Sequence, residues 1–278
     1  MKEKIIEKIL MILACSAIGI LALITIYIFK EGLPIIIKVG INDFLFNSKW
    51  APTKGHFGIL SMIISSLAVT FGAMILGIPL SLACSITLAE FAPPRLMLIL
   101  KPTIELLAGI PSVVYGFLGV LLLVPFIRDY LGGPGLSLLA ASIILAIMIL
   151  PTITSISIDA LQAVPLLYKE GALAMGATHW QAIRLVLLPA ARSGVVTAII
   201  LGMARAIGET MAVIMVAGNA LKIPTSLLNP VRTLTSNIAL EMSYSAGDHR
   251  TALFATGIIL FIFIMALNVL ANSLMRKK

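Results

Sequence analysis

Residues 166–189 read LLYKEGALAMGATHWQAIRLVLLP and separate two long apolar runs of the chain. The first part contains no helix breaker except one glycine, and Gly176 fits the position just after a helix end, where glycine is favoured. Thr178 has the side chain of an N-cap, and Gln181 follows three residues later, as in a capping box. The stretch therefore predicts two short helices joined by a glycine turn. The whole segment 159–192 is too long for a simple connection, so we expect it to form either a docking surface or an amphipathic pair of helices that rests on the membrane.

The rest of the chain has the composition of a membrane protein. Of its 278 residues, 60% are hydrophobic and only 12% are charged, and the mean hydropathy is +1.09. Soluble domains carry roughly 25% charged residues, and disordered chains are poor in hydrophobic ones, so both classes are excluded. We predict an all-α integral membrane protein, since apolar runs of this length suit spanning helices better than barrel strands.

Six segments are long enough to cross a bilayer, which takes roughly 20 mostly apolar residues. They lie at residues 9–29, 59–89, 106–127, 136–158, 193–217 and 251–275 and form a single transmembrane domain. Near the inner end of the third span, Gly109 and Pro111 predict a bent or broken helix.

The distribution of positive charge indicates the orientation of the spans. Six spans place both termini on one side, and Lys and Arg are enriched on the cytoplasmic side of membrane proteins. With cytoplasmic termini, the inner segments carry 11 Lys and Arg residues and the outer segments carry 8. The clearest clusters lie at the chain ends, at Lys2, Lys4, Lys8 and residues 276–278. We therefore expect both termini and loop 159–192 in the cytoplasm, and loops 30–58 and 220–250 outside.

The first span is interpreted as a signal anchor. Its apolar run exceeds the roughly 7–15 residues of the hydrophobic region of a cleaved signal peptide. The net charge of +8 is explained by the topology, because no basic stripe with interleaved aromatic residues points to nucleic acid. The two outer loops are long enough to meet a soluble partner.

Two charged residues stand near the middle of the fifth span. An ionised group there costs about 2.5–3.5 kcal/mol on insertion scales, so we expect Arg205 and Glu209 to face the bundle interior or an aqueous path. On a helix they share one face with small residues that allow another helix to approach closely. This small-residue ridge consists of Gly194, Ala198, Gly202 and Ala206.

The charged pair has two interpretations. In the first, it is an ion pair that neutralises itself and stabilises the bundle. In the second, it lines a substrate path for an oxyanion, because a guanidinium group binds phosphate bidentately. Since Glu209 repels anions, the second interpretation takes the form of a switch. Arg205 would pair with Glu209 at rest and would be released toward a passing oxyanion.

Catalytic and metal-binding patterns are not found. The sequence has no Gly-Lys dipeptide, hence no Walker A loop, and it has no nucleophile elbow and no His-Glu-x-x-His motif. His56, His179 and His249 are isolated in separate loops, without the spacing of metal ligands. We predict no catalytic residue, no metal site and no cofactor in this chain. If ATP drives the protein, another chain supplies it.

The helix–turn–helix segment resembles the EAA loop of ABC-importer permeases. The family pattern is Glu-Ala-Ala, three residues, Gly, nine residues, Ile, one residue and Leu-Pro, and this chain keeps that spacing. The matching residues are Glu170, Ala172, Gly176, Leu188 and Pro189. Gly171 and Val186 depart from the pattern, in place of an alanine and an isoleucine. In that family the loop forms the coupling helix that sits in a cleft of the ATP-hydrolysing subunit.

A second stretch narrows the resemblance. Residues 204–213, ARAIGETMAV, are similar to the phosphate-specific transport (Pst) permeases, and the Met-Ala-Val ending resembles the C-type rather than the A-type subunit. Residues 107–116, LAGIPSVVYG, and residues 50–52, WAP, agree with this. The resemblance covers nearly the whole chain from Trp50 onward.

The resemblance implies a type I ABC-importer permease fold and a non-catalytic permease subunit of a phosphate importer in a prokaryotic inner membrane. The implied partners are a homologous A-type permease, two ATPase subunits that bind ATP and Mg²⁺, and an extracytoplasmic phosphate-binding protein. We assign Arg205 and Glu209 to the substrate path. The residues assigned to ATPase coupling are Glu170, Gly176, Leu188 and Pro189.

Other functions remain open at this point. The coupling loop contacts ATPases and not substrate, so a permease for sulfate, molybdate or phosphonate fits it equally. An ion-driven secondary transporter would have inverted repeats and intramembrane acids for a proton relay, and only Glu209 is central. A structural or signalling scaffold would leave Arg205 unexplained.

Overall fold

The computed structural model describes residues 2–276, and the surroundings of side chains within residues 6–269. Lys277 and Lys278, counted above among the terminal charges, lie outside the described residues, as do the side chains of Lys2 and Lys4. The described chain is helical apart from one short hairpin and the connecting loops, as the composition predicts.

Five helical segments are long and apolar enough to cross a membrane. They are Ile6–Val39 in α1 (Lys2–Val39), Leu60–Phe91 with α3 (Leu60–Ile86), Ser112–Leu131 with α5 (Ser112–Leu118) and α6 (Val124–Phe126), α7 (Leu138–Gln162), and Asp248–Val269 in α14 (Asp248–Arg276). A sixth span is reached when His179–Ala190 is joined to α11 (Arg192–Gly208), and these two helices meet at 72°. α11 alone has 17 residues, at the short end of the range that spans a bilayer.

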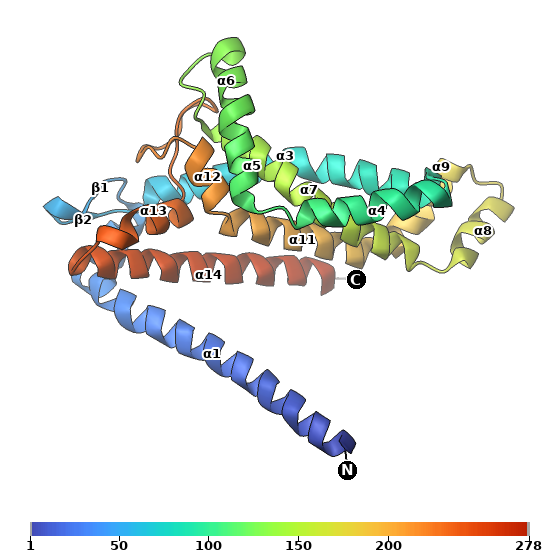
Figure 1. The fold of residues 1–278 in the computed structure, drawn as a ribbon, viewed down its shortest axis with the longest axis horizontal. Coiled ribbons are helices and arrows are strands. Elements are labelled where there is room, and N and C mark those ends of the chain that lie inside the picture. The colour runs from blue at the N-terminus through green and yellow to red at the C-terminus, as the bar shows by residue number, and fades with distance from the viewer. Residues whose placement is uncertain (1, 277–278) are drawn as a thin grey trace.

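Four long helices form the body of the molecule. Figure 1 shows α3, α7, α11 and α14 running along the long axis, whereas the segment with α5 and α6 stands across them. α1 packs on α14 and diverges from the bundle toward its N-terminus. The pairing of α3 with α7 is the most extensive of the described helix pairs.

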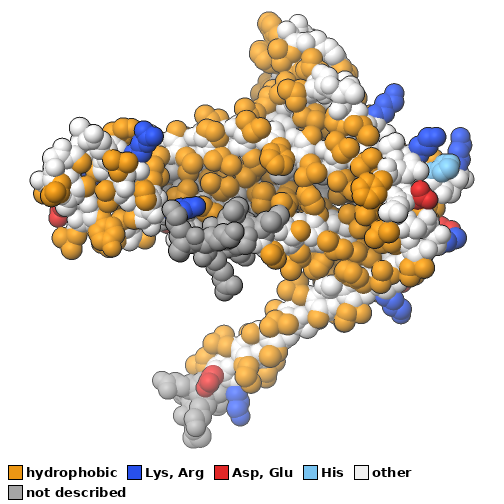
Figure 2. Space-filling view, turned by 180° about the vertical axis from the view of Figure 1, so that it is seen from behind, with side chains coloured by type: hydrophobic (Ala, Val, Ile, Leu, Met, Phe, Trp, Pro, Cys, Tyr) orange, Lys and Arg blue, Asp and Glu red, His pale blue; other side chains and the backbone are white. Residues whose placement is uncertain are grey.

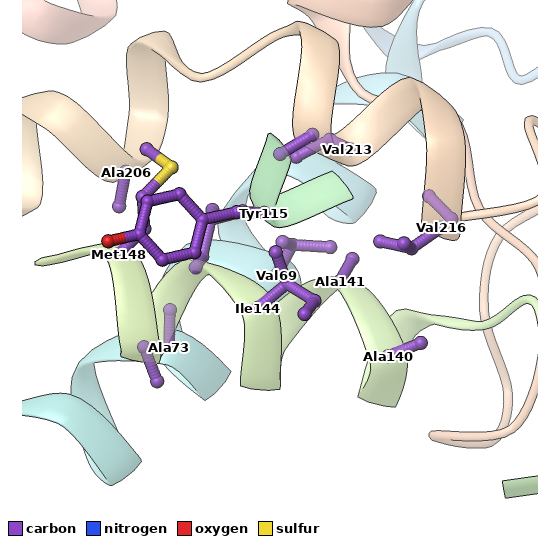
Figure 3. Packing of buried hydrophobic residues seen from close by; sticks show 14 of the residues in the cluster. Val69, Ala73, Tyr115, Ala140, Ala141, Ile144, Met148, Ala206, Val213 and Val216 are labelled. Atoms are coloured by element: carbon purple, nitrogen blue, oxygen red, sulfur yellow. The ribbon is translucent and has the colours of Figure 1, made fainter. Parts of the chain in front are cut away.

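The core lies where α3, α7 and α11 meet α5 and α12 (Met211–Val216). Figure 3 shows the buried cluster, into which Tyr115 reaches from α5. The expected ridge on α11 faces α7 of the same chain: a Cβ at Gly202 would lie 2.6 Å from Ile153 Cγ1, and one at Gly194 would collide with Ala160. Because glycine has no Cβ, the two helices approach closely at these positions.

The third span differs from the expectation for residues 106–127. α4 (Pro94–Ala108) includes residues 106–108, and a new helix starts only at Ser112. Pro111 has no N–H to donate and disfavours helical backbone before it. The bend predicted from Gly109 and Pro111 is therefore a complete break between two helices.

The fifth span, expected at residues 193–217, is also interrupted. α11 ends at Gly208, Glu209 has extended backbone angles of φ −67° and ψ 133°, and the helix resumes at Met211. The carbonyl of Glu209 accepts a hydrogen bond from Thr235 Oγ1 at 2.9 Å. This contact with a distant segment replaces the helical hydrogen bond that a continuous span would make.

Two groups of connecting segments lie at opposite ends of the long axis (Figure 1). One end carries α8 (Leu166–Ala174) and α9 (His179–Ala182), followed by α10 (Leu188–Ala190). The other end carries α2 (Ile41–Phe46), the antiparallel hairpin of β1 (Trp50–Ala51) and β2 (His56–Phe57), and α13 (Leu234–Glu241). Figure 2 shows hydrophobic side chains over the middle of one face, with most charged side chains toward the ends. Such an apolar band suits the hydrocarbon core of a bilayer.

Candidate functional site

The guanidinium group of Arg205 joins three helices. Arg205 lies in the last turn of α11 and is half-buried. Its Nη1 donates to Thr152 Oγ1 on α7 at 3.2 Å, and its Nη2 donates to the main-chain carbonyl of Ala108, the last residue of α4, at 3.2 Å. The side chain therefore sits where the packed pair α7–α11 meets the broken third span.

The carbonyls at the end of α4 explain why a cation is held there. The last turn of a helix has carbonyls without an intrahelical N–H partner, and its end carries partial negative charge. Ala108 presents such a carbonyl to Arg205, and the Leu107 carbonyl accepts from the Tyr115 hydroxyl at 2.8 Å. Two side chains from other helices thus satisfy the end that the break at residues 109–111 opens.

Arg205 and Glu209 do not pair in the described part of the chain. The carboxylate of Glu209 instead accepts the N–H of Ala212 at 3.1 Å and so caps the start of α12. The interruption after Gly208 takes Glu209 out of the α11 helix, which removes the i,i+4 geometry that the sequence predicted. The switch hypothesis requires an ion pair between Arg205 and Glu209 at rest. These two described residues do not form one in this structure. The partners of the Arg205 guanidinium are a hydroxyl and a carbonyl, both uncharged.

The four residues assigned to ATPase coupling lie along the helix–turn–helix segment. Glu170 is exposed on α8. Gly176 has φ +87° and follows the end of α8, where its N–H donates to the Leu173 carbonyl at 2.9 Å. The capping box of Thr178 and Gln181 at the start of α9 is present as predicted. The prediction of two helices joined by a glycine turn is therefore confirmed.

The remaining two coupling residues connect this segment to the span that follows. Leu188 is half-buried and packs against the small cluster of Leu161, Ala191 and Val195. Pro189 is exposed in α10, which continues the helix from His179 after the π-helical turn Ile183–Leu187. Large apolar side chains on the same segment are exposed and offer a docking surface. They are Leu166, Leu167, Tyr168, Leu173, Met175, Trp180 and Leu185.

The opposite end is organised around a carboxylate that the sequence analysis did not single out. Glu241, at the end of α13, is 7% exposed. It accepts from Trp50 Nε1 at 2.8 Å and from Arg232 Nη1 at 2.7 Å, and it lies 2.8 Å from His249 Nε2. One carboxylate thus links the hairpin, the loop before α13 and the start of α14.

A basic pocket opens beside the hairpin at this end. Its volume is about 650 Å³. Its lining residues are Ser48, Lys49, Trp50, Ala51, Lys54, His56, Leu221, Lys222 and Ile223. This lining includes three lysines and no acidic side chain, so the pocket favours anions.

The histidines are less isolated than their sequence positions suggested. His179 lies 3.4 Å from Glu90 Oε2, and His249 contacts Glu241. Among the described residues, no group of three or more His, Cys, Asp and Glu side chains is placed to hold a metal ion. Sequence reasoning assigned no role in a site to Glu90, Arg232 and Glu241, because their partners lie far away in the chain or depend on how loop 220–250 folds. The available signal was only that each is a charged residue close to an apolar run or within an outer loop.

These features define a class of protein. Multiple apolar spans, two of them interrupted around a half-buried cation, and a helical docking segment at one end describe a helical membrane transport component. The chain belongs to the family of binding-protein-dependent transport system inner membrane components, whose sequence profile matches residues 77–277.

Curated relatives agree with this membership. The chain is 43% identical over 277 residues to the probable ABC transporter permease protein YqgH of Bacillus subtilis, covering 95% of this chain and 89% of the relative. It is 36% identical over 240 residues to the phosphate transport system permease protein PstC of Pasteurella multocida, covering 79% and 75%. A PstC protein of Mesorhizobium japonicum is also 36% identical, over 84% of this chain and 78% of its own.

A solved structure shows the same fold. An inward-facing form of the MetNI methionine ABC transporter matches with a TM-score of 0.63 at 21% identity, covering 82% of this chain and 98% of its own. The expected all-α permease fold of type I ABC importers is thereby confirmed. The chain is a non-catalytic permease subunit of the prokaryotic plasma membrane. It works with separate ATPase subunits and a substrate-binding protein.

Proposed function

We propose that this chain is the permease subunit that passes inorganic phosphate through the membrane in an ATP-driven importer. The observation that carries the proposal is the half-buried guanidinium of Arg205, whose hydrogen-bond acceptors are uncharged oxygens. A charged side chain within a span is costly, and such residues commonly mark ion paths. Relatives named as phosphate transport permeases, which match over most of this chain, support phosphate as the anion.

The chemistry of Arg205 suits a tetrahedral oxyanion. A guanidinium presents five donors in a planar fork and binds phosphate through two parallel hydrogen bonds. Both donors that face Thr152 and Ala108 are directed by residues of other helices, so the fork is already oriented. Phosphate reaching this point would replace a neutral partner with a charged one. Glu209 contributes to the anion path only indirectly in this proposal. Its carboxylate caps α12 by accepting the Ala212 N–H.

The outer pocket supports an anionic substrate as well. Lysines are disfavoured in outer segments of membrane proteins, yet Lys49, Lys54 and Lys222 line one pocket there under the proposed topology. A positive mouth raises the local concentration of an anion and speeds its arrival. The same sign of charge at the mouth and at Arg205 favours passage of anions over cations.

A homologous A-type permease is the proposed partner within the membrane. The segment Ser112–Leu131 stands across the bundle in Figure 1, and much of its apolar surface is left uncovered by the described chain. Phe117, Leu121, Leu122 and Phe126 are each more than half exposed. A second permease beside this segment would cover these side chains.

Two ATPase subunits are proposed to dock on the helix–turn–helix segments of the two permeases. They would bind ATP and Mg²⁺, so this chain itself needs no cofactor. Glu170, Gly176, Leu188 and Pro189 shape the docking segment in this chain, and the exposed apolar side chains on α8 and α9 supply the contact area. A phosphate-binding protein would deliver the anion at the end that carries the basic pocket.

The test is transport by the purified complex in liposomes. The chain is co-expressed with an A-type permease and ATPase subunits, and uptake of labelled phosphate and of labelled sulfate is measured with the matching binding protein. Arg205→Ala should lower phosphate uptake by roughly 10- to 100-fold, because a hydrogen bond to a charged group contributes about 1.5–3 kcal/mol. Arg205→Lys should recover only part of it, since an ammonium group lacks the planar fork.

Arg95→Ala provides the matched control. Arg95 is exposed in the first turn of α4, away from the Arg205 site and from the segment Ser112–Leu131, so its loss should leave uptake unchanged. Normal uptake by Arg205→Ala would disprove the anion-path role. If sulfate, molybdate or phosphonate stimulates ATP hydrolysis and phosphate does not, the assignment as a permease stands and the proposed substrate is wrong. Failure of the complex to contain an A-type permease would disprove the heterodimer.

A further inference from the structure

A carboxylate at the inner end of α3 contacts both arms of the helix–turn–helix segment. Glu90 lies in the π-helical turn Thr87–Phe91 that extends α3. Its Oε2 lies 2.6 Å from Lys169 Nζ on α8 and 3.4 Å from Nε2 of His179, the first residue of α9. One oxygen of a membrane helix therefore meets two separate helices of the docking segment.

An aromatic contact reinforces this arrangement. The ring of Phe91 stacks on the ring of His179, with centroids 4.9 Å apart and planes at 27°. Two successive residues of the α3 extension thus contact the start of α9. Between the two arms the backbone passes through Gly176 in a left-handed conformation, which fixes the direction of the turn.

The ion pair is partly shielded from solvent. The Glu90 side chain is 9% exposed and the Lys169 side chain 24% exposed, in contrast to the Lys38–Asp248 pair at 64% and 54%. Exposed pairs are weakened by water and salt, whereas shielded pairs are screened much less. Removing the charge of Glu90 would leave the Lys169 ammonium without this partner in a restricted space, so the contact is expected to resist separation.

The position of α3 gives this contact a route to the substrate path. α3 packs along α7 in the most extensive helix pair of the described chain. α7 carries Thr152, which accepts from Arg205. A displacement of α8 and α9 that pulled on Glu90 would therefore move the helix that packs on the Arg205 site.

We propose that Glu90 is a positioning residue for coupled transport, which holds α8 and α9 to α3 through Lys169 and His179. Movement imposed on the docking segment by the ATPase subunits is then passed to α3, instead of being absorbed by flexing of the segment. The inference rests on the permease family and on the contacts of Glu90, and it does not depend on which anion is carried. A role limited to folding of the segment makes a different prediction, because such a role would leave the transport yield of each ATP unchanged in complexes that assemble.

The experiment measures anion taken up per ATP hydrolysed by the complete importer in liposomes. Glu90→Gln keeps the size of the side chain and removes its charge. ATPase subunits should still co-purify and hydrolyse ATP, whereas uptake per ATP should fall several-fold, because hydrolysis would then move α8 and α9 without moving α3. Lys169→Gln should act in the same direction. The double variant Glu90→Lys with Lys169→Glu rebuilds the link to α8 and should recover part of the ratio.

Asp159→Asn is the matched control. Asp159 accepts from Lys101 Nζ at 2.5 Å near the same end of the molecule, but this pair joins α7 to α4 rather than to α8 or α9. Its uptake per ATP should stay at the wild-type value, because α8 and α9 keep their contacts with Glu90. The proposal is overturned if Glu90→Gln and Lys169→Gln both keep the wild-type ratio, or if Asp159→Asn lowers it equally. It is also overturned if the single variants no longer bind the ATPase subunits and the double variant Glu90→Lys with Lys169→Glu recovers neither ATPase binding nor uptake per ATP.

The result for Glu90 does not depend on which anion the importer carries. Each variant is compared with the wild-type complex carrying the same anion. If the wild-type complex imports sulfate and not phosphate, the proposed substrate is wrong, while the ratio for Glu90→Gln still tests the contact.

Discussion

Arg205 and Ala108 are 97 residues apart in the chain, and the guanidinium of one closes the open helix end of the other at 3.2 Å. The contact places a positive charge at the C-terminal end of α4, where the helix dipole is negative. It also explains why the guanidinium is oriented without a carboxylate partner. Substitutions at Thr152 and at Glu209 test two consequences of this arrangement.

Removing the Thr152 hydroxyl should weaken the site without abolishing it. Thr152→Val leaves one donor of a half-buried guanidinium without its acceptor, and the Ala108 contact remains. The free energy of unfolding should fall by about 1–3 kcal/mol. Thermal unfolding of the purified complex measures this, with Thr152→Ser as the control that keeps the hydroxyl. Equal stability of the two variants would show that the hydrogen bond contributes nothing.

Exchanging the charges of Arg205 and Glu209 should not restore transport. The two side chains do not pair, and Glu209 instead caps α12 through Ala212. Arg205→Glu with Glu209→Arg should therefore remain as inactive as Arg205→Glu alone. Glu209→Gln should keep most activity, because its amide oxygen can still accept the Ala212 N–H, whereas Glu209→Ala should cost about 1 kcal/mol as a lost cap. Recovery of uptake in the double variant would favour a direct ion pair in another state of the cycle.

The same substitution at two glycines should have opposite effects on stability. A Cβ at Gly202 would lie 2.6 Å from Ile153 Cγ1, so Gly202→Ala must displace either the Ile153 side chain or α11 itself and should destabilise by about 1–3 kcal/mol. Gly171 lies within α8, and a Cβ added there would have no neighbouring atom within 4 Å, so Gly171→Ala should stabilise that helix by roughly 0.5–1 kcal/mol. Unfolding midpoints of the two variants in one detergent provide the comparison. A stabilising Gly202→Ala would contradict the close packing of α7 and α11.

Loss of the Glu241 carboxylate should destabilise the end of the molecule that carries the hairpin. Glu241→Ala removes the partner of Arg232 and the acceptor of Trp50, and breaking a buried pair in this way costs about 3–5 kcal/mol. Asp248→Asn is the contrasting case, because its pair with Lys38 is exposed and should contribute no more than about 1 kcal/mol. Limited proteolysis around residues 217–233, together with thermal unfolding, measures both. Equal effects of the two variants would mean that burial of Glu241 adds no stability.

Local patterns were sufficient for part of this fold. Hydropathy located the spans, and the spacing of Gly176, Thr178 and Gln181 predicted the helix–turn–helix segment, because caps and glycine turns act within a few residues. Gly109 and Pro111 marked the break in the third span for the same reason. These signals are local, so the sequence displays them directly.

The interruption of the fifth span had no comparable signal. The sequence of residues 204–213 is compatible with a continuous helix, and the break is stabilised by Thr235, which reaches Glu209 from 26 residues later in the chain. The contacts of Glu90 and Glu241 were not predicted, because their partners Lys169 and Trp50 lie 79 and 191 residues away in the chain. Tertiary contacts of this kind override local helix propensity.

The cap that Arg205 provides for α4 has a thermodynamic consequence under the proposed function. When the anion takes the guanidinium N–H that is now donated to the Ala108 carbonyl, the two acceptors compete for that donor. By linkage, any state that separates α4 from α11 raises the affinity for the anion, and the bound anion favours that state by the same free energy. An anion bound in the substrate path thereby removes the cap that Arg205 provides for α4. A permease with bound anion therefore differs in free energy from one without it before any ATP is hydrolysed.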